Sequence, residues 1–144
     1  MRVYFDTSVL VAGLVECHPD HARAMAWIDR VDRKEVRGVI SLHGVAETWS
    51  VLTSLPLRPA IQGSTALRLV REGLLARFEV AEADRRDYER VLEAAADREV
   101  RGGAVYDALH AAMARKARAE EILTLDLRDF RRVAPDYGSR VRAP

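Results

Sequence analysis

The chain has 144 residues, of which 49% are hydrophobic and 31% charged, and its 23 basic residues nearly balance its 22 acidic residues. This composition excludes an intrinsically disordered protein, and the length predicts a single domain over residues 1–144. The near-zero net charge excludes a uniformly basic nucleic-acid-binding domain, although it leaves room for a local basic cluster.

We expect the protein in a reducing cytoplasm, away from membranes. One cysteine allows neither an intramolecular disulfide nor a cysteine-based zinc site. The first residues reach Asp6 before an apolar signal-peptide segment can form. No stretch approaches the about 18 consecutive apolar residues of a membrane-spanning helix.

The first half of the chain predicts two strands and three helices. In chain order they are a strand at 3–5, a helix at 9–16, a helix at 19–31, a strand at 38–41 and a helix at 42–55. The strand before Asp6 is apolar and β-prone, which predicts a buried strand. Thr7 and Ser8 offer N-cap chemistry for the first helix, and Pro19 suits the first turn of the second. Pro56 ends the third helix.

The second half predicts three further strands. In chain order the elements are a helix at 60–75, a strand at 78–80, helices at 83–100 and 104–119, a strand at 122–125, a helical turn at 126–130 and an edge strand near Val141. Because strands alternate with helices, we expect an α/β fold with a parallel sheet covered on both faces. Ligands bind such sheets at the carboxyl ends of the strands, so functional residues are expected there.

Four acidic residues occur where such a site would form. They are Asp6 after the first strand, Glu47 in the third helix, Asp107 in the first turn of the helix at 104–119, and Asp126 after the fourth strand. Carboxylates gathered at one sheet edge repel one another and lose hydration, so the cluster needs a neutralising cation. Mg²⁺ and Mn²⁺ prefer oxygen ligands, so we expect one of these ions.

Each acid also has a simpler interpretation. Asp6 is compatible with a helix cap, Asp107 with an acid favoured by the helix dipole, and Asp126 with a turn residue. Glu47 alone is typical of a helix surface. Asp129 is an alternative ligand or a supporting residue. The joint placement of these residues at strand ends and helix starts favours a site.

The segments around these acids resemble the motifs of PIN-domain nucleases. The matching segments, in order, are VYFDTSVL from Val3, HPDH from His18, GVAE from Gly44, YDALHAA from Tyr106 and ILTLDLRDF from Ile122. The resemblance covers nearly the whole chain. The size is similar to that of VapC-type toxins, the toxin subunits of VapBC toxin–antitoxin pairs.

This resemblance implies a PIN-like three-layer fold, with sheet order 3-2-1-4-5, and hydrolysis of RNA that depends on Mg²⁺ or Mn²⁺. The residues that match the family's acidic metal site are Asp6, Glu47, Asp107 and Asp126. Ser8 and Thr124 match polar residues that support the first and last acids. Three positions separate Asp126 from Asp129, where many members have two, and this leaves the role of Asp129 open.

The expected chemistry is hydrolysis of a phosphodiester by in-line attack of a water molecule that a metal ion activates. Asp6 and Asp107 are expected to be the main ligands. Glu47 binds through water or orients the attacking water, and Asp126 completes a second metal position. One metal ion and two metal ions both fit the pattern.

Positive charge after the last acid is expected to hold RNA. Residues 115–142 contain eight basic and five acidic residues, a net charge of +3. Arg128, Arg131 and Arg132 are expected to contact phosphates, while a solvated surface or a protein partner explains each arginine singly. The resemblance also implies a homodimer and an antitoxin whose tail covers the acidic groove. Apolar residues such as Trp27 and Leu67 support the dimer, because they exceed what a small core can bury.

The histidines are expected to play smaller parts. His110 lies one helical turn after Asp107, so it either faces the same site or is a satisfied structural histidine. His43, like His18 and His21, lacks metal-ligand spacing and is expected to be a cap or surface residue.

A binding protein is the alternative function: a PIN-like module that holds RNA or protein with little or no cleavage. Other phosphate-handling enzymes fit less well. A receiver domain needs a lysine after a late strand, and a phosphate loop needs Gly-Lys-Ser/Thr, whereas Lys34 and Lys116 fall in or near helices. A haloacid-dehalogenase-like phosphatase needs a second aspartate where this chain has Ser8.

Overall fold

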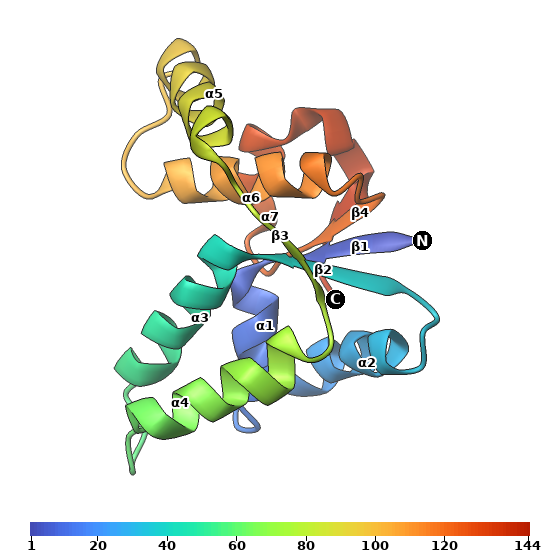
Figure 1. Ribbon diagram of the computed structural model, residues 1–144, viewed down its shortest axis with the longest axis vertical. Coiled ribbons are helices and arrows are strands. Elements are labelled where there is room, and N and C mark those ends of the chain that lie inside the picture. Colours follow the sequence, from blue (N-terminus) through green and yellow to red (C-terminus); the bar gives the residue numbers. More distant parts are fainter.

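A parallel sheet of five strands crosses the molecule in the order β3-β2-β1-β4-β5 (Figure 1). The computed structural model describes residues 1–144. The strands are β1 Arg2–Phe5, β2 Arg37–Ser41, β3 Glu79–Ala81, β4 Glu121–Leu123 and β5 Val141–Arg142. Every neighbouring pair is parallel. The expected α/β fold and the strand order 3-2-1-4-5 are therefore confirmed.

Helices cover both faces of this sheet and complete the three layers. They are α1 Thr7–Leu14, α2 His21–Asp32, α3 Leu42–Ser54, α4 Gly63–Val70, α5 Arg85–Asp97, α6 Ala104–Lys116 and α7 Leu127–Val133. A π-helical turn at Arg71–Leu75 extends α4, and a 3₁₀ segment at Pro135–Arg140 precedes β5. Figure 1 shows α1 to α4 on one side of the sheet and α5 to α7 on the other. No helix combines the length and the apolar character needed to cross a bilayer.

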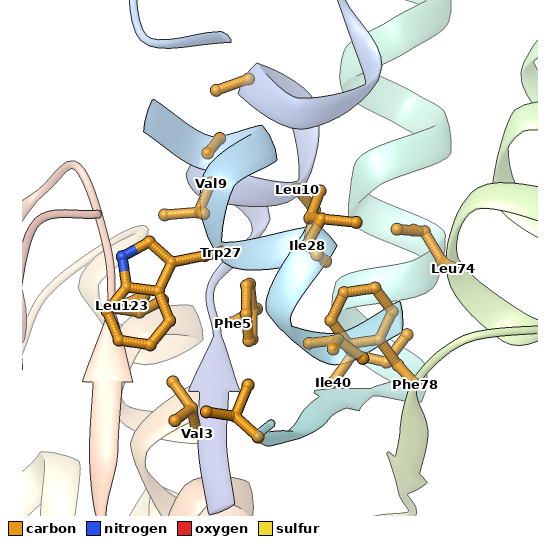
Figure 2. Close-up of a cluster of buried hydrophobic side chains, with 14 of the residues drawn as sticks. Val3, Phe5, Val9, Leu10, Trp27, Ile28, Ile40, Leu74, Phe78 and Leu123 are labelled. Carbon is orange, nitrogen blue, oxygen red and sulfur yellow. The ribbon is translucent and has the colours of Figure 1, made fainter. Parts of the chain in front are cut away.

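Two apolar layers hold the helices to the sheet, because alternate residues of β1 point to opposite faces. Val3 and Phe5 belong to the core formed with α1, α2 and the end of α4, where Phe5 meets Phe78 edge-on at 5.0 Å (Figure 2). Tyr4 belongs to the other core, with α6 and α7. β1 is thereby buried on both faces, and its carboxyl end is rigidly placed.

Polar residues at the strand ends start the helices. Asp6 accepts a hydrogen bond from the backbone N–H of Ser8 and caps α1, so Asp6 takes the place predicted for Thr7 and Ser8. Ser41 caps α3 by accepting from the Gly44 N–H at 3.0 Å. These caps satisfy backbone donors at the helix N-termini, and they bring the first turns of the helices to the carboxyl edge of the sheet.

Two strand boundaries differ from the predicted ones for identifiable reasons. β4 ends at Leu123 rather than at Leu125, because the Leu125 N–H leaves the ladder and donates to Ser8 Oγ at 3.0 Å. β3 begins at Glu79, since the Phe78 N–H donates to the Leu74 carbonyl and closes the preceding helix.

The aromatic and apolar surface also differs from expectation. Trp27 is buried in the core beside α1, so it does not contribute to an exposed apolar patch. Leu67 remains exposed at 42%. Trp49 on α3 is exposed as well.

Candidate metal centre

The four predicted acids lie on elements that start or end at the carboxyl edge of the sheet. Asp6 follows β1, Asp126 follows β4, and Asp107 lies in the first turn of α6. Glu47 lies further along α3, and its contact with His110 ties it to the same edge. The fold therefore supplies the convergence that the sequence predicts, from segments far apart in the chain.

One carboxylate oxygen of Asp6 is held by hydrogen bonds, and the other is free. The residue is 5% exposed. Oδ2 accepts hydrogen bonds from Ser8 Oγ at 2.6 Å, from the Ser8 N–H at 3.3 Å and from Thr124 Oγ1 at 3.0 Å. Oδ1 accepts no hydrogen bond, and His110 Nε2 lies 3.7 Å from it. Oδ1 is thus available to a cation.

Ser8 and Thr124 support Asp6 and also fix the turn that carries Asp126. Thr124 is buried, and its Oγ1 accepts from the Asp126 N–H at 3.0 Å. Ser8 Oγ accepts from the Leu125 N–H in the same turn. These two hydroxyls join the start of α1 to the end of β4.

Glu47 is anchored by a buried network that sequence reasoning largely missed. Its Oε2 accepts from Thr7 Oγ1 at 2.7 Å and lies 2.8 Å from His110 Nε2. His110 is 1% exposed, and its Nδ1 lies 2.7 Å from the Tyr4 hydroxyl. The hydrogen bond from His110, with help from Thr7, lowers the pKa of Glu47 to about 2. Glu47 is therefore ionised across the physiological range.

His110 is at once a satisfied buried histidine and a residue of the site. Burial disfavours its charged form, but the hydrogen bond to Glu47 and the charge of Asp6 outweigh burial and raise the pKa of His110. The spacing of three residues from Asp107 was the only sequence signal for this position.

Burial, together with the other acids of the cluster, disfavours the ionised form of Asp107. Burial first, and then the negative charge of Asp6, raise the pKa of Asp107 to about 6, with smaller contributions from Asp126 and Asp129. Its carboxylate accepts no hydrogen bond from the protein. A carboxylate held near other carboxylates without a compensating donor is a group that a cation would stabilise.

Asp126 and Asp129 lie at the start of α7. Asp126 caps this helix, with Oδ1 accepting from the Asp129 N–H at 3.2 Å, and its other oxygen accepts no hydrogen bond from the protein. The carboxylate of Asp129 accepts none either. The free oxygens of these residues, and those of Asp6 and Asp107, are of the ligand type that Mg²⁺ and Mn²⁺ prefer, and the charges of Asp6, Asp126 and Asp129 all act on Asp107.

The ligand-type side chains whose ligand atoms lie within 4.8 Å of one another are His43, Glu47 and His110, a set that contains none of the aspartates. Both ring nitrogens of His110 already contact protein groups, which makes this set a poorer metal site than the carboxylates. His43 Nε2 lies 3.8 Å from Glu47 Oε2, so His43 borders the site and the expectation of a mere cap or surface residue was wrong. Burial, and then His110, lower the pKa of His43.

Gly44 allows the close approach of α3 to this network. A Cβ atom at Gly44 would lie 3.0 Å from His110 Cε1 and 3.3 Å from Ser41 Oγ. The absence of a side chain here lets α3 bring Glu47 onto His110.

The three candidate phosphate-binding arginines lie on α7. Arg128, Arg131 and Arg132 are exposed, and their side chains form no ion pair and no hydrogen bond within the chain. Their charges are therefore not neutralised by neighbouring acids.

Comparisons with known proteins identify relatives of this chain. The PIN domain family model matches residues 3–135. The chain is 38% identical to ribonuclease VapC27 of Mycobacterium tuberculosis, across 85% of this chain and 83% of that protein. It is 35% identical to ribonuclease VapC40 of the same species, across 85% of each chain.

Solved structures share the fold at low sequence identity. VapC20 of Mycobacterium tuberculosis, a sarcin–ricin loop cleaving toxin, is 21% identical, with a TM-score of 0.64 over 83% of this chain and 86% of that one. VapBC2 of Rickettsia felis, bound to a promoter DNA fragment, is 17% identical with a TM-score of 0.62 over 92% of each chain. FitAcB of Neisseria gonorrhoeae is 19% identical with a TM-score of 0.60, over 91% of this chain and 92% of that one.

Proposed function

The chain belongs to the PIN domain family, and we propose that it is a metal-dependent ribonuclease, the toxin of a type II toxin–antitoxin pair. The observation that carries this proposal is the set of carboxylate oxygens, on Asp6, Asp107 and Asp126, that are left without protein donors at one edge of the sheet. The ribonuclease names of relatives at 35% and 38% identity support the reaction. We further propose that residues 1–144 form one nuclease domain.

In the proposed mechanism, Asp6 and Asp107 would hold a Mg²⁺ or Mn²⁺ ion, and Asp126 would supply a further oxygen ligand. Such an ion lowers the pKa of water and neutralises charge on a phosphodiester. Ser8 and Thr124 donate to Asp6 Oδ2, so Oδ1 would be the oxygen left to bind the ion.

Glu47 is proposed to orient the attacking water rather than to take its proton. A carboxylate with a pKa of about 2 is a weak base at neutral pH. Thr7 and His110 hold its Oε2, so Oε1 is the atom left to accept a hydrogen bond from water.

Cleavage of RNA by the purified protein tests this proposal. The wild type is expected to cleave single-stranded RNA with Mg²⁺ and to stop when the metal is chelated. Asp6→Asn and Asp107→Asn are expected to lose cleavage, whereas Asp97→Asn, at the exposed end of α5, is the matched control and retains it. Cleavage without metal, or full activity of Asp6→Asn, would overturn the assignment. RNA binding without cleavage by the wild type would favour the alternative of a binding module.

We also propose a homodimer and a cognate antitoxin as partners. Exposed apolar side chains on neighbouring helices, Trp49 on α3 and Leu67 on α4, offer a surface for either partner. Light scattering is expected to give the mass of a dimer at micromolar concentration, and a monomer there would contradict the dimer. The cytoplasm is the proposed location, since the exposed Cys17 has no disulfide partner in the chain.

A further inference from the structure

A column of aromatic rings runs from the core to the mouth of the candidate site. Tyr4 is fully buried and meets the His110 ring edge-on, with centroids 5.9 Å apart. His110 meets His43 edge-on at 5.4 Å. His43 then stacks on Tyr106, with centroids 5.1 Å apart and 19° between the planes. The column ends at Tyr106, which is 51% exposed.

Tyr106, the exposed end of the column, is connected to two of the candidate acids. Tyr106 directly precedes Asp107 in the first turn of α6. Its stacking partner His43 lies 3.8 Å from Glu47. Tyr106 is therefore next to Asp107 in the chain, and it is connected to Glu47 through His43.

Tyr106 differs from the other large exposed aromatic residues. Tyr88 on α5 is 44% exposed and Trp49 on α3 is 43% exposed, and neither stacks on another ring. Exposed apolar surface of this size carries a hydration cost, and at Tyr106 the neighbouring imidazole fixes the ring without covering it. A flat ring that is supported on one side and open to solvent suits stacking with another flat ring.

From this arrangement we propose that Tyr106, supported by His43, is the stacking platform for a nucleobase of single-stranded RNA next to the cleaved phosphodiester. The inference rests on the proposed ribonuclease function and adds a base-binding position to it. Single-stranded RNA is recognised by aromatic side chains on which unstacked bases lie. Stacking also gives the RNA an attraction that does not depend on charge, at a site whose carboxylates repel phosphate.

Binding of RNA without turnover is the first test. Every protein in this assay carries Asp6→Asn to prevent turnover, and Mg²⁺ is present. The probe is a labelled single-stranded RNA of about 12 nucleotides. Tyr106→Ala is expected to weaken binding about 10-fold, while the dependence of affinity on salt concentration keeps its slope. Tyr106→Phe should retain binding, and Tyr88→Ala is the matched control. The platform would be overturned if Tyr106→Ala bound RNA as tightly as the protein with Tyr106, or if Tyr106→Phe lost as much affinity as Tyr106→Ala.

Removal of single bases identifies the partner of the ring. One abasic position near the cleaved bond is expected to weaken binding as much as Tyr106→Ala does, and the two losses should not add. If the loss of affinity from Tyr106→Ala adds to the loss from each abasic position tested, stacking on Tyr106 is contradicted. Because the side chain is exposed, the melting temperature of Tyr106→Ala should equal that of the unmutated protein.

Cleavage kinetics separate this inference from the function on which it rests. With otherwise wild-type protein, Tyr106→Ala is expected to raise KM about 10-fold and to leave kcat nearly unchanged. If the wild type cleaves RNA and Tyr106→Ala has the same KM, only the platform is wrong. If the wild type neither binds nor cleaves RNA, the ribonuclease proposal itself is wrong.

Discussion

His110 Nε2 lies 2.8 Å from Glu47 Oε2, although 63 positions separate the two residues in the chain. The pair joins α6 to α3, and the hydroxyl of Tyr4 on β1 contacts the other ring nitrogen of His110. The same contact therefore stabilises the packing of two helices and sets the orientation of a proposed catalytic side chain.

His110→Ala is expected to lower the free energy of unfolding by about 3 kcal/mol, because it leaves Glu47 with Thr7 as its only donor and opens a cavity. Tyr4→Phe removes only a hydroxyl and should cost about 1 kcal/mol. Urea denaturation of the metal-free proteins measures both. A cost for His110→Ala no larger than that for Tyr4→Phe would show that the buried pair contributes little.

Asp107→Asn is expected to stabilise the metal-free protein at neutral pH. Burial and the charge of Asp6 raise the pKa of Asp107 from 3.8 to about 6, so the folded chain retains a proton there that the unfolded chain releases. The contribution of Asp107 to the free energy of unfolding therefore falls as the pH rises from about 4 to about 6. Because the side chain is partly exposed, the expected gain in Asp107→Asn is only about 1 kcal/mol at pH 8.

Denaturation in chelator at pH 4 and pH 8 measures this difference, which should vanish at pH 4. Addition of Mg²⁺ at pH 8 should then stabilise the wild type more than Asp107→Asn, since a ligand stabilises the state that binds it. An advantage of the variant that is independent of pH would rule out the electrostatic explanation.

Thr124→Val is expected to weaken Mn²⁺ binding about 10-fold, because Asp6 loses one of the donors that orient it. The Asp126 N–H also loses its acceptor, so stability should fall by about 2 kcal/mol. Calorimetric titration with Mn²⁺ measures the affinity. Thr53→Val is the control, since the Thr53 hydroxyl bonds only to carbonyls of its own helix. Equal Mn²⁺ affinity in both variants would remove Thr124 from the site.

Reversal of the charges of Arg128, Arg131 and Arg132 to Glu is expected to weaken RNA binding and to reduce the salt slope by about 2, as loss of three phosphate contacts implies. Stability should change little, because these side chains form no ion pairs within the chain. The control reverses three exposed arginines around α4: Arg58, Arg68 and Arg71. An unchanged salt slope in the α7 variant would place the RNA elsewhere.

The sheet, and the position of acidic residues such as Asp6 and Asp107 near its carboxyl edge, were predictable because they depend on local pattern. The apolar strand before Asp6 and the first-turn position of Asp107 are visible in short segments of sequence, and parallel strands bring such positions to one edge. The PIN-domain resemblance supplied the strand order.

The supporting contacts were not predictable, because their partners are distant in sequence. Nothing local indicates that Ser8 Oγ accepts from the Leu125 N–H, which is 117 positions away, and this bond shortens β4. The part played by His110 depends on which face of α6 meets β1. His43 was missed for the same reason, since spacing alone does not orient α3.

The position of β1 in the middle of the sheet has a consequence for synthesis on the ribosome. β1 emerges first, yet it pairs with β4, whose residues follow more than a hundred positions later. A nascent chain that stops before β4 has Asp6 without the hydroxyl of Thr124 and without Asp126. The proposed site cannot assemble until the last strands join the sheet, so we expect unfinished chains to lack cleavage activity.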